Sequence, residues 1–249
     1  MELILGDCLE EMKKIPDKSI DLILSDLPYG TTACKWDVII PFEPLWEQYE
    51  RVIKKQGAIV LTASQPFTSL LVTSNIALFK YNWIYEKARP GGFVSAKLKP
   101  LKNTEDILVF SFGATANGSS RNMKYFPQGV KNGHEWGRPQ KYNMKETGYG
   151  RESQKLKRKL DGTNYPRQII KFNNPNNNVL HPTEKPVELM EYLIQTYTSE
   201  NDLVLDSCMG SGTTGIACIN TNRQFIGIEK DPNYFEVAKR RIENHITSD

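Results

Sequence analysis

A four-residue stretch near the N-terminus combines groups that can hold an amine. Asp26, Leu27, Pro28 and Tyr29 directly follow an apolar run that predicts a buried strand. The Asp26 carboxylate and the carbonyl of Leu27 or Pro28 are acceptors, and Pro28 stiffens the turn because its ring fixes φ and biases Leu27 toward extended geometry. The Tyr29 ring offers a face on which a planar ring can stack. The stretch is therefore a candidate receptor for a planar amine, although Asp, Pro, Tyr and Gly are also ordinary turn residues.

The chemistry that suits these groups is transfer onto an exocyclic amino nitrogen of a nucleobase. Such an amine is a poor nucleophile because its lone pair is delocalised into the ring. Two acceptors would bind its two hydrogens, favour a tetrahedral nitrogen and free the lone pair for attack on a methyl sulfonium. The ionised Asp26 would stabilise the charge that develops, and a methyl donor held nearby would supply proximity. Asp26 is expected to act first as an acceptor, and proton uptake by it stays open.

A second informative stretch is LVLDSCMGSGTTGIA, residues 203–217. Its glycines at 210, 212 and 215 have G-x-G-x-x-G spacing between a predicted strand and a predicted helix. Glu229 ends the next predicted strand, where a carboxylate can accept hydrogen bonds from ribose hydroxyls. This context favours a ligand that contains adenosine, the alternative being a tight turn without a ligand.

Two features favour S-adenosylmethionine over a dinucleotide. A dinucleotide-binding half needs further strands after the glycine turn, but only one predicted helix follows Glu229. The missing strands must then come from the N-terminal half, which predicts a circularly permuted sheet. Asp206, just before the turn, would repel a pyrophosphate but could pair with the amino group of a methionine moiety. An NAD-binding oxidoreductase is the rival interpretation.

Short apolar runs alternate with helical patterns, which predicts an α/β fold with a mostly parallel sheet and crossover helices. The seven expected strands cover residues 3–6, 21–25, 58–62, 83–86, 107–111, 203–206 and 225–229. The expected helices cover residues 8–14, 43–54, 66–76, 184–197, 213–220 and 233–244.

One segment interrupts this alternation and carries the positive charge. Residues 113–178 contain 13 Lys or Arg and 4 Asp or Glu, a net charge of +9 in a chain whose total is +3. Aromatic residues lie among these cations, at positions 125, 126, 136, 142, 149, 165 and 172. Such interleaving suits a polyanion with stackable bases, although a solvated loop can have the same composition. We expect an inserted module at 113–178 between the two halves of one domain, 1–112 and 179–249.

Composition restricts the class of protein. The 249 residues are 39% hydrophobic and 24% charged, and no apolar run approaches the roughly 18 residues of a membrane span. The four cysteines include no C-x-x-C pair, so free thiols are expected rather than a disulfide framework or a metal site. The N-terminus lacks the basic-then-apolar order of a secretory signal. We expect no membrane partner and a cytoplasmic protein of bacterial or phage origin.

The two stretches together resemble the amino-group DNA methyltransferases, in the subgroup whose catalytic motif precedes the cofactor motif. The family pattern D/N/S-P-P-Y/F/W is matched at residues 26–29, with Leu27 in place of the first proline. The D-P-F-x-G-S-G-T-T turn is matched at residues 206–214, with Ser207 and Cys208 in place of Pro and Phe. The H-P-T-x-K-P motif stands intact at residues 181–186.

This resemblance implies a Rossmann-like methyltransferase fold that uses S-adenosylmethionine and acts on double-stranded DNA. Residues 113–178 would be the target-recognition region. The target base would be flipped out of the stack, with Tyr29 as its stacking partner. Asp26 in the first motif position favours adenine N6, since cytosine-N4 enzymes of this kind more often carry serine. A homodimer and a restriction endonuclease partner are both compatible with the resemblance.

Asp26, Pro28 and Tyr29 are the candidate catalytic residues. The resemblance implies a set of cofactor-binding residues: Asp7 near the adenine, Asp206 near the methionine portion, Glu229 on the ribose, Gly210, Ser211, Gly212 and Thr213 in the turn, and Lys185 on the segment that walls the pocket. The alternatives are a cytosine-N4 enzyme, methylation of protein or RNA, and a catalytically weak DNA-binding protein of the same fold, which Leu27 prompts.

Overall fold

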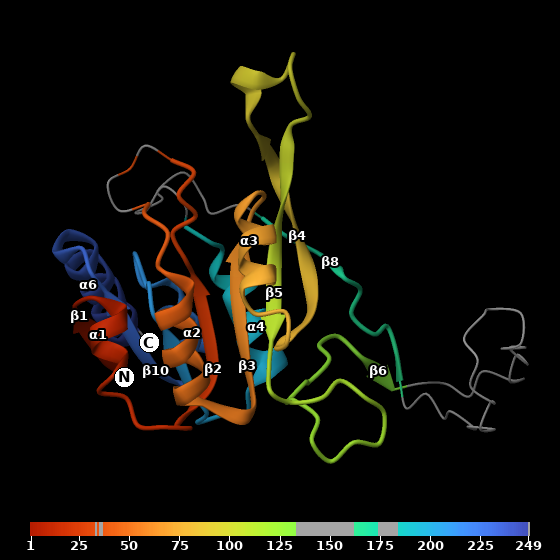
Figure 1. Ribbon diagram of the computed structural model, residues 1–249, viewed down its shortest axis with the longest axis vertical. Coiled ribbons are helices and arrows are strands. Elements are labelled where there is room, and N and C mark those ends of the chain that lie inside the picture. The colour runs from red at the N-terminus through yellow and green to blue at the C-terminus, as the bar shows by residue number, and fades with distance from the viewer. Residues whose placement is uncertain (33, 35–36, 133–161, 174–183, 249) are drawn as a thin grey trace, which may run out of the picture. The chain divides into compact units, whose positions relative to one another are not determined.

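The protein is described by a computed structural model, in which residues 1–32, 34, 37–132, 162–173 and 184–248 are placed. The chain divides into two compact units, residues 127–167 and the remainder. The larger unit is built on an eight-stranded sheet in its described part, shown in Figure 1. Its strands are β1 (Glu2–Leu5), β2 (Ile20–Asp26), β3 (Ile53–Ala63), β4 (Phe79–Gly91), β5 (Lys102–Phe110), β8 (Ile169–Phe172), β9 (Leu203–Asp206) and β10 (Gln224–Glu229).

The strand order is β1-β10-β9-β2-β3-β5-β4-β8, with β5 antiparallel to both of its neighbours and the other pairs parallel. The two C-terminal strands β9 and β10 therefore lie between β1 and β2. This arrangement confirms the Rossmann-like α/β fold, completed by strands from both halves of the chain. The sheet has one strand more than the seven expected. The additional strand, β8, was missed because only Ile170 of its four residues is buried, so it has no strong apolar pattern.

Helices cover both faces of the sheet (Figure 1). One face carries α1 (Cys8–Met12), α2 (Phe42–Val52) and α3 (Phe67–Ser74), and the other carries α4 (Val187–Tyr197), α5 (Thr213–Asn220) and α6 (Pro232–Ser248). The alternation of side chains along a strand explains the two cores. In β2, Ile23 packs with the first three helices, whereas Leu22 and Leu24 pack with the other three.

The strands β4 and β5 extend far beyond their predicted bounds. Ala63, the last residue of β3, pairs with Asp106, so the residues of β5 before Asp106 have no partner on that side. They pair instead with β4, up to the Gly91–Lys102 pair, and a 3-10 turn over Phe93–Ser95 closes the hairpin. The apolar pattern covers only the buried half of this hairpin, which is why the sequence predicted short strands.

The smaller unit contains a two-stranded antiparallel sheet of β6 (Lys131–Asn132) and β7 (Gly162–Thr163). Its extent, residues 127–167, is narrower than the predicted insertion at 113–178. The flanking residues belong to the larger unit because they pack on it: Met123 is buried, and Lys124 pairs with Asp21 at 2.9 Å and with Asp202 at 2.6 Å. Much of the predicted basic module, residues 133–161 and 174–178, lies outside the described residues, so its function stays a prediction.

No helix in the described ranges is both long and apolar enough to cross a bilayer.

Candidate active site

Five parallel strands end side by side at one edge of the sheet. They are β1, β10, β9, β2 and β3, and they bring Asp7, Glu229, Asp206, Asp26 and Thr62 to that edge. Ligands of open α/β sheets bind outside the carboxyl ends of strands, where the strand order reverses. Here that point lies between β9 and β2, so Asp206 and Asp26 flank it.

The Asp26 carboxylate is held by three side chains. Its Oδ1 accepts hydrogen bonds from the hydroxyls of Thr62 and of Tyr29, the latter at 2.7 Å, and its Oδ2 accepts one from Lys185 Nζ at 2.6 Å. Burial alone would raise the pKa of Asp26, but the Lys185 charge and these hydrogen bonds outweigh it and lower the pKa. An ionised carboxylate has about four acceptor positions, so one stays open for a further donor.

Lys185 connects this carboxylate to a second one. The Lys185 side chain is only 7% exposed, and its Nζ lies 3.5 Å from Glu105 Oε2 as well as beside Asp26. The other Glu105 oxygen accepts a 2.5 Å hydrogen bond from Lys87. Burial lowers the pKa of Lys185, but the two carboxylates more than compensate and the net shift is upward. The sequence grouped Lys185 with the cofactor residues, whereas the structure places its ammonium against Asp26.

Tyr29 is fixed by its hydroxyl and by one face of its ring. The hydroxyl also lies 3.1 Å from Thr62 Oγ1, and the ring stacks on Phe67 with centroids 5.1 Å apart and planes 22° apart. Burial and the charge of Asp26 raise the pKa of Tyr29 well above its usual value, so the phenol stays a neutral donor. Phe67 covers one face of the ring, so a planar ligand would have to stack on the other, and Lys185 Nζ lies over the ring at 6.0 Å from its centroid.

The turn after Asp26 is anchored in spite of its single proline. Leu27 is 4% exposed and packs in the core that contains α2 and α3. Beyond Tyr29, the Asp37 carboxylate accepts hydrogen bonds from the backbone N–H groups of Gly30 at 2.8 Å, Thr31 at 2.9 Å and Thr32 at 2.6 Å. Burial of Leu27 and capping by Asp37 therefore supply anchoring that a first proline would otherwise contribute through its rigid ring.

Asp206 has different surroundings. Its Oδ2 accepts from Thr214 Oγ1 at 2.6 Å, and its Oδ1 accepts from the Cys208 N–H at 3.1 Å. Within the described chain, no cationic side chain forms an ion pair with it. Burial raises its pKa to about 7, and the nearby Asp26 charge adds to this rise.

Glu229 holds two backbone segments, the glycine turn and the start of α6. Its carboxylate accepts from the Gly210 N–H at 2.9 Å and from the Asp231 N–H at 2.8 Å. Burial raises the pKa of Glu229 more than these hydrogen bonds lower it. Of the roughly four acceptor positions of a carboxylate, two are used in this way, and the remainder can bind ligand hydroxyls.

The glycine turn is hydrogen-bonded to Arg241 of α6. Arg241 Nη1 lies 3.1 Å from Ser211 Oγ and 3.0 Å from Thr213 Oγ1, and its Nη2 pairs with Glu184 at 2.7 Å. This single guanidinium therefore joins the glycine turn to the residue that precedes Lys185.

The glycines of the turn have a structural reason. Gly212 has a φ of +81°, and a Cβ there would lie 3.1 Å from Ala238 Cβ of α6. A Cβ on Gly215 would lie 2.7 Å from Ile242 Cδ1. Close packing of α5 on α6 thus accounts for these two glycines without a ligand, and Asp206 and Glu229 are the better evidence for one.

Asp7 is already occupied as a helix cap. Its Oδ1 accepts from the Leu9 N–H at 2.9 Å at the start of α1, and its Oδ2 accepts from Lys230 Nζ at 3.0 Å. These contacts, the Lys230 hydrogen bond foremost, lower the pKa of Asp7. Its expected role near an adenine stays a prediction, and His181, Pro182 and Thr183 of the third motif lie outside the described residues.

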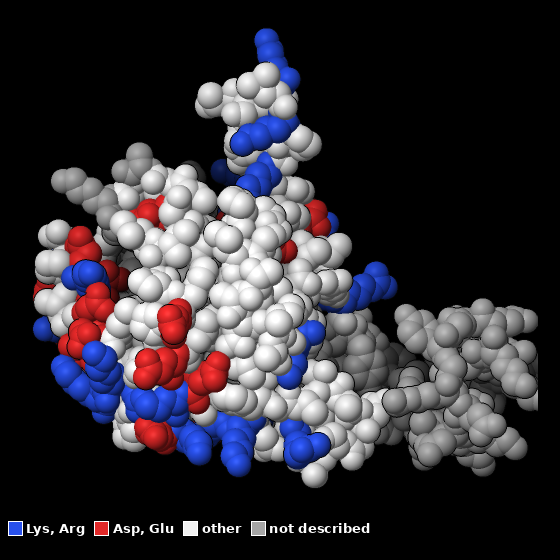
Figure 2. Space-filling view, viewed as in Figure 1, with Lys and Arg blue, Asp and Glu red and all other residues white. Residues whose placement is uncertain are grey.

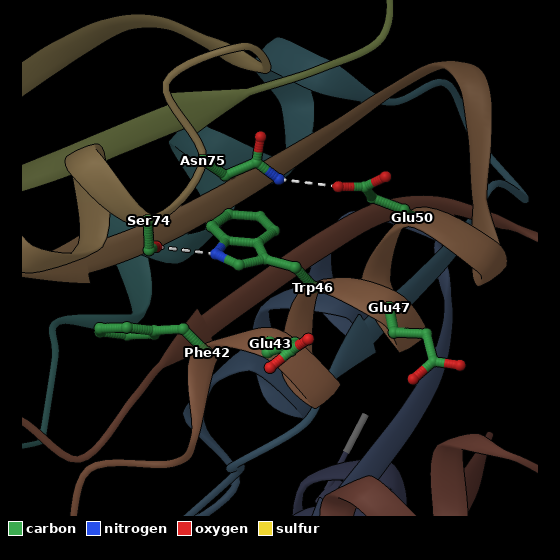
Figure 3. Close-up of a pocket in the computed structure, with 7 residues that line it drawn as sticks. All are labelled: Phe42, Glu43, Trp46, Glu47, Glu50, Ser74 and Asn75. Carbon is green, nitrogen blue, oxygen red and sulfur yellow. Dashed lines mark hydrogen bonds between the residues drawn. The ribbon is translucent and has the colours of Figure 1, made fainter.

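A separate open pocket lies between α2 and the end of α3, shown in Figure 3. Trp46 Nε1 donates to Ser74 Oγ there, and Asn75 Nδ2 donates to Glu50, both at 2.8 Å. None of the candidate site residues lines this pocket. Its carboxylates, from Glu43, Glu47 and Glu50, disfavour a phosphate or a nucleic acid.

The sequence missed several residues that shape the site: Thr62, Asp37, Glu105 and Arg241. Thr62 ends a predicted strand, so the rule that sites lie at strand ends could have identified it. Asp37 is close in sequence to the N–H groups that it caps, but no motif marks it. Glu105 and Arg241 are distant in sequence from the partners they contact. Among the described residues, no cluster of His, Cys, Asp and Glu is arranged to hold a metal ion.

Comparison with known proteins gives concordant matches. The sequence profile of the DNA methylase family, N6 and N4 methyltransferases, matches residues 20–240. The DNA adenine methyltransferase YhdJ of Escherichia coli is 31% identical, over 97% of this chain and 82% of its own. The type II methyltransferase M.HpaI of Haemophilus parainfluenzae is 27% identical, over 97% and 74%.

Solved structures with the same fold include the M1.HpyAVI–SAM complex and the cytosine-N4-specific PvuII DNA methyltransferase. The first has a TM-score of 0.64 at 24% identity and covers 96% of this chain and 98% of its own. The second has a TM-score of 0.64 at 15% identity and covers 98% and 90%.

Proposed function

Because the chain belongs to the DNA methylase family, we propose that it transfers a methyl group from S-adenosylmethionine to the N6 amino group of adenine in double-stranded DNA. The observation that carries this proposal is the pair Asp26 and Asp206 on neighbouring strand ends. One is an ionised acceptor suited to a neutral amine, and the other is a buried carboxylate suited to a cation.

The residues of the glycine turn fit the proposed cofactor. Asp206 is a buried acceptor whose donors are a hydroxyl and a backbone N–H, so the amino group of a methionine moiety would supply the missing positive charge. The open acceptor positions of Glu229 suit the two ribose hydroxyls. When bound there, S-adenosylmethionine supplies an electrophilic methyl group. Asp7, Gly210, Ser211, Gly212 and Thr213 are the further residues that we propose around it.

The chain's own groups would activate the amine. The open acceptor position of Asp26 would bind one amino hydrogen, and the backbone carbonyl of Leu27 or Pro28 would bind the other. The nitrogen becomes positive as the new N–C bond forms and the methyl–sulfur bond of the sulfonium breaks, leaving a neutral thioether. The charge of Asp26 stabilises the nitrogen until it releases a proton to Asp26 or to water. Lys185 keeps Asp26 ionised and oriented, so we assign Lys185 a positioning role rather than the cofactor role inferred from sequence. Tyr29 would stack on the flipped base with the face that Phe67 does not cover.

Adenine is the proposed base for two reasons. Asp26 occupies the first position of the D/N/S-P-P-Y/F/W motif, where an aspartate favours adenine N6. YhdJ, which matches nearly the whole chain, is named as an adenine methyltransferase. Cytosine N4 is the second candidate, because the PvuII enzyme, named as cytosine-N4-specific, shares the fold. Several relatives are named as type II methyltransferases, which supports a partner restriction endonuclease. A homodimer also belongs to this proposal.

The test is transfer of labelled methyl from S-adenosylmethionine to unmethylated genomic DNA, followed by digestion to nucleosides. We expect the label in N6-methyladenine. Label in N4-methylcytosine would show that the target base is cytosine, the second candidate. A protein that binds S-adenosylmethionine and DNA but transfers no label would be the catalytically weak DNA-binding protein, and the proposed activity would be wrong.

A further inference from the structure

The β4–β5 hairpin projects from the same edge of the sheet as the candidate active site. Before Asp106, β5 has only β4 as a neighbour, and this outer part of the hairpin stands free of the helices in Figure 1. β5 runs antiparallel to β3, so its beginning lies at the end of β3, beside Thr62. The hairpin thus leaves the sheet where the acceptor Asp26 lies.

Its outer part has an unusual composition. From Lys87 to Lys102 the chain contains five cations and no acid: Lys87, Arg89, Lys97, Lys99 and Lys102. In the space-filling view the projecting end carries Lys or Arg and no Asp or Glu (Figure 2). Lys97 and Lys99, at the turn, are exposed and make no ion pair within the described chain. A surface of one sign that projects into solvent favours a polyanion.

The same turn exposes large apolar side chains. Phe93 is 67% exposed, Val94 103% and Leu98 88%, so the fold gives them almost no packing partners. Exposed apolar residues among cations are typical of proteins that insert a wedge between base steps of a duplex. Aromatic side chains also stack on bases that have been separated from their neighbours.

The foot of the hairpin contacts the catalytic groups. Lys87 on β4 bonds to Glu105 on β5 at 2.5 Å, and Glu105 lies 3.5 Å from Lys185, which bonds to Asp26. Lys102 donates a hydrogen bond to Ser64, just beyond the end of β3. The hairpin is therefore fixed at its foot to the groups that would receive the base.

We propose that the tip of this hairpin, residues 91–101, is a DNA-contacting wedge, separate from the predicted target-recognition segment at 113–178. Lys97 and Lys99 bind phosphates, and Phe93, Val94 and Leu98 pack against bases next to the extruded one. Flipping requires unstacking, and apolar side chains that fill the vacated space offset part of that cost. The inference rests on the proposed function, since it takes duplex DNA as the substrate.

The first experiment compares two variants of the tip by fluorescence anisotropy on mixed-sequence 30-bp duplexes over a range of NaCl concentrations. Lys97→Gln/Lys99→Gln should reduce the slope of log K against log salt by about 2, because two phosphate contacts are lost. Phe93→Ser/Val94→Ser/Leu98→Ser should keep the slope and weaken binding about tenfold or more, since stacking and wedge contacts are lost. Unchanged S-adenosylmethionine affinity in both variants would show that they are folded.

Matched controls lie on α6. Lys239→Gln/Arg240→Gln removes two exposed cations, and Ile246→Ser removes an apolar side chain that is 53% exposed. Both should bind DNA like the wild type. Equal slope changes in the two cation variants would mean that net charge alone matters and would overturn the proposal.

The second experiment uses a duplex with 2-aminopurine at the methylated position, once that position has been found by sequencing of modified bases. The apolar variant should show a smaller fluorescence rise on binding than the wild type, and methyl transfer should fall in parallel. Wild-type behaviour of both tip variants on DNA that the wild-type enzyme methylates would overturn the wedge and leave the proposed function intact. Absence of methyl transfer by the wild type would instead refute the proposed function, and the salt titration would still decide on the tip.

The rival occupant is a second copy of the chain, whose acid-lined pocket (Figure 3) could take a cationic hairpin. Analytical ultracentrifugation of the same variants decides whether the tip contacts DNA or a second copy of the chain. A shift from dimer to monomer in the tip variants, with DNA affinity per subunit and salt slope unchanged, would assign the tip to a subunit interface and contradict the wedge.

Discussion

Asp26 and Asp206 end neighbouring parallel strands, and their carboxylates have opposite electrostatic surroundings. Asp26 is bonded to the Lys185 ammonium at 2.6 Å, and its pKa is lowered in spite of burial. Asp206 is bonded to a hydroxyl and a backbone N–H, and burial raises its pKa to about 7. The protein thus places a cation beside Asp26, and none of its described residues forms an ion pair with Asp206.

This difference suggests how two similar side chains take two different ligands. A neutral amine needs an acceptor that is already ionised, which Lys185 provides for Asp26. A cationic ligand gains most from a carboxylate that has no cation of its own, because the ligand then replaces the missing charge. The predictions below alter one side of this contrast at a time.

Removal of the Asp26 carboxylate should have the largest effect. We expect Asp26→Ala to lower methyl transfer by about a thousandfold or more, since the amine loses its charged acceptor, with S-adenosylmethionine affinity within a few-fold of the wild type. Single-turnover transfer and calorimetric binding measure the two quantities. Asp26→Asn is the control for volume and should be nearly as slow. Full activity in either variant would remove Asp26 from the mechanism.

Lys185→Met should make Asp26 resemble Asp206. Without the ammonium, burial raises the pKa of Asp26, so a larger share of the carboxyl is protonated at a given pH and transfer falls about a hundredfold. Because a higher pH restores the ionised form, the acidic limb of the pH–rate profile should move upward and activity should recover in alkali. A residue that only supports the fold would lower the rate equally at every pH.

Two controls accompany this variant. Lys185→Arg keeps the charge and should leave the acidic limb close to that of the wild type. Thermal melting of Lys185→Met checks that the loss of a buried charge partner, which can cost about 3–5 kcal/mol, has not unfolded the protein.

Asp206→Asn should weaken the binding of S-adenosylmethionine by about tenfold to a hundredfold, because a charge-assisted contact is lost. In the wild type the ionised form binds the cation, so affinity should rise as pH increases through about 7. The variant should lose this pH dependence, as calorimetry at pH 6 and pH 8 would reveal. A pH-independent wild type would show that Asp206 does not face the ligand's charge.

The sequence predicted both Asp26 and Asp206 as site residues because a local motif marks each of them. Asp26 and Asp206 each follow a short apolar run and precede a turn, so strand-end reasoning placed both at one edge before their contacts were known. The role of the glycine turn in cofactor binding stays a prediction, and the turn also has a packing role that the sequence did not reveal. Gly212 and Gly215 are required by the packing of α6, which cannot be inferred from their spacing.

The electrostatic difference between the two sites could not be predicted from the sequence. It depends on Lys185, which lies 159 residues from Asp26, and on Glu105, which the sequence did not single out. The long β4–β5 hairpin was also missed, because its outer residues pair only with each other and need no apolar pattern. Contacts that cross the sheet, rather than motifs along the chain, set the charge at each strand end.

The smallest change should come from Glu105→Gln. Glu105 shares Lys185 with Asp26, and its buried Oε2 accepts no hydrogen bond in the structure. Neutralising Glu105 removes a negative charge near Asp26 and leaves Lys185 to it, so the pKa of Asp26 should fall and the acidic limb of the pH–rate profile should move down by less than about one unit. Glu188→Gln, on α4, is a matched control that should leave the limb in place. If Glu105→Gln instead moves the acidic limb to higher pH, Glu105 is needed to hold Lys185 against Asp26. The low pKa of Asp26 would then depend on the three charges of Glu105, Lys185 and Asp26, rather than on the Lys185–Asp26 pair alone.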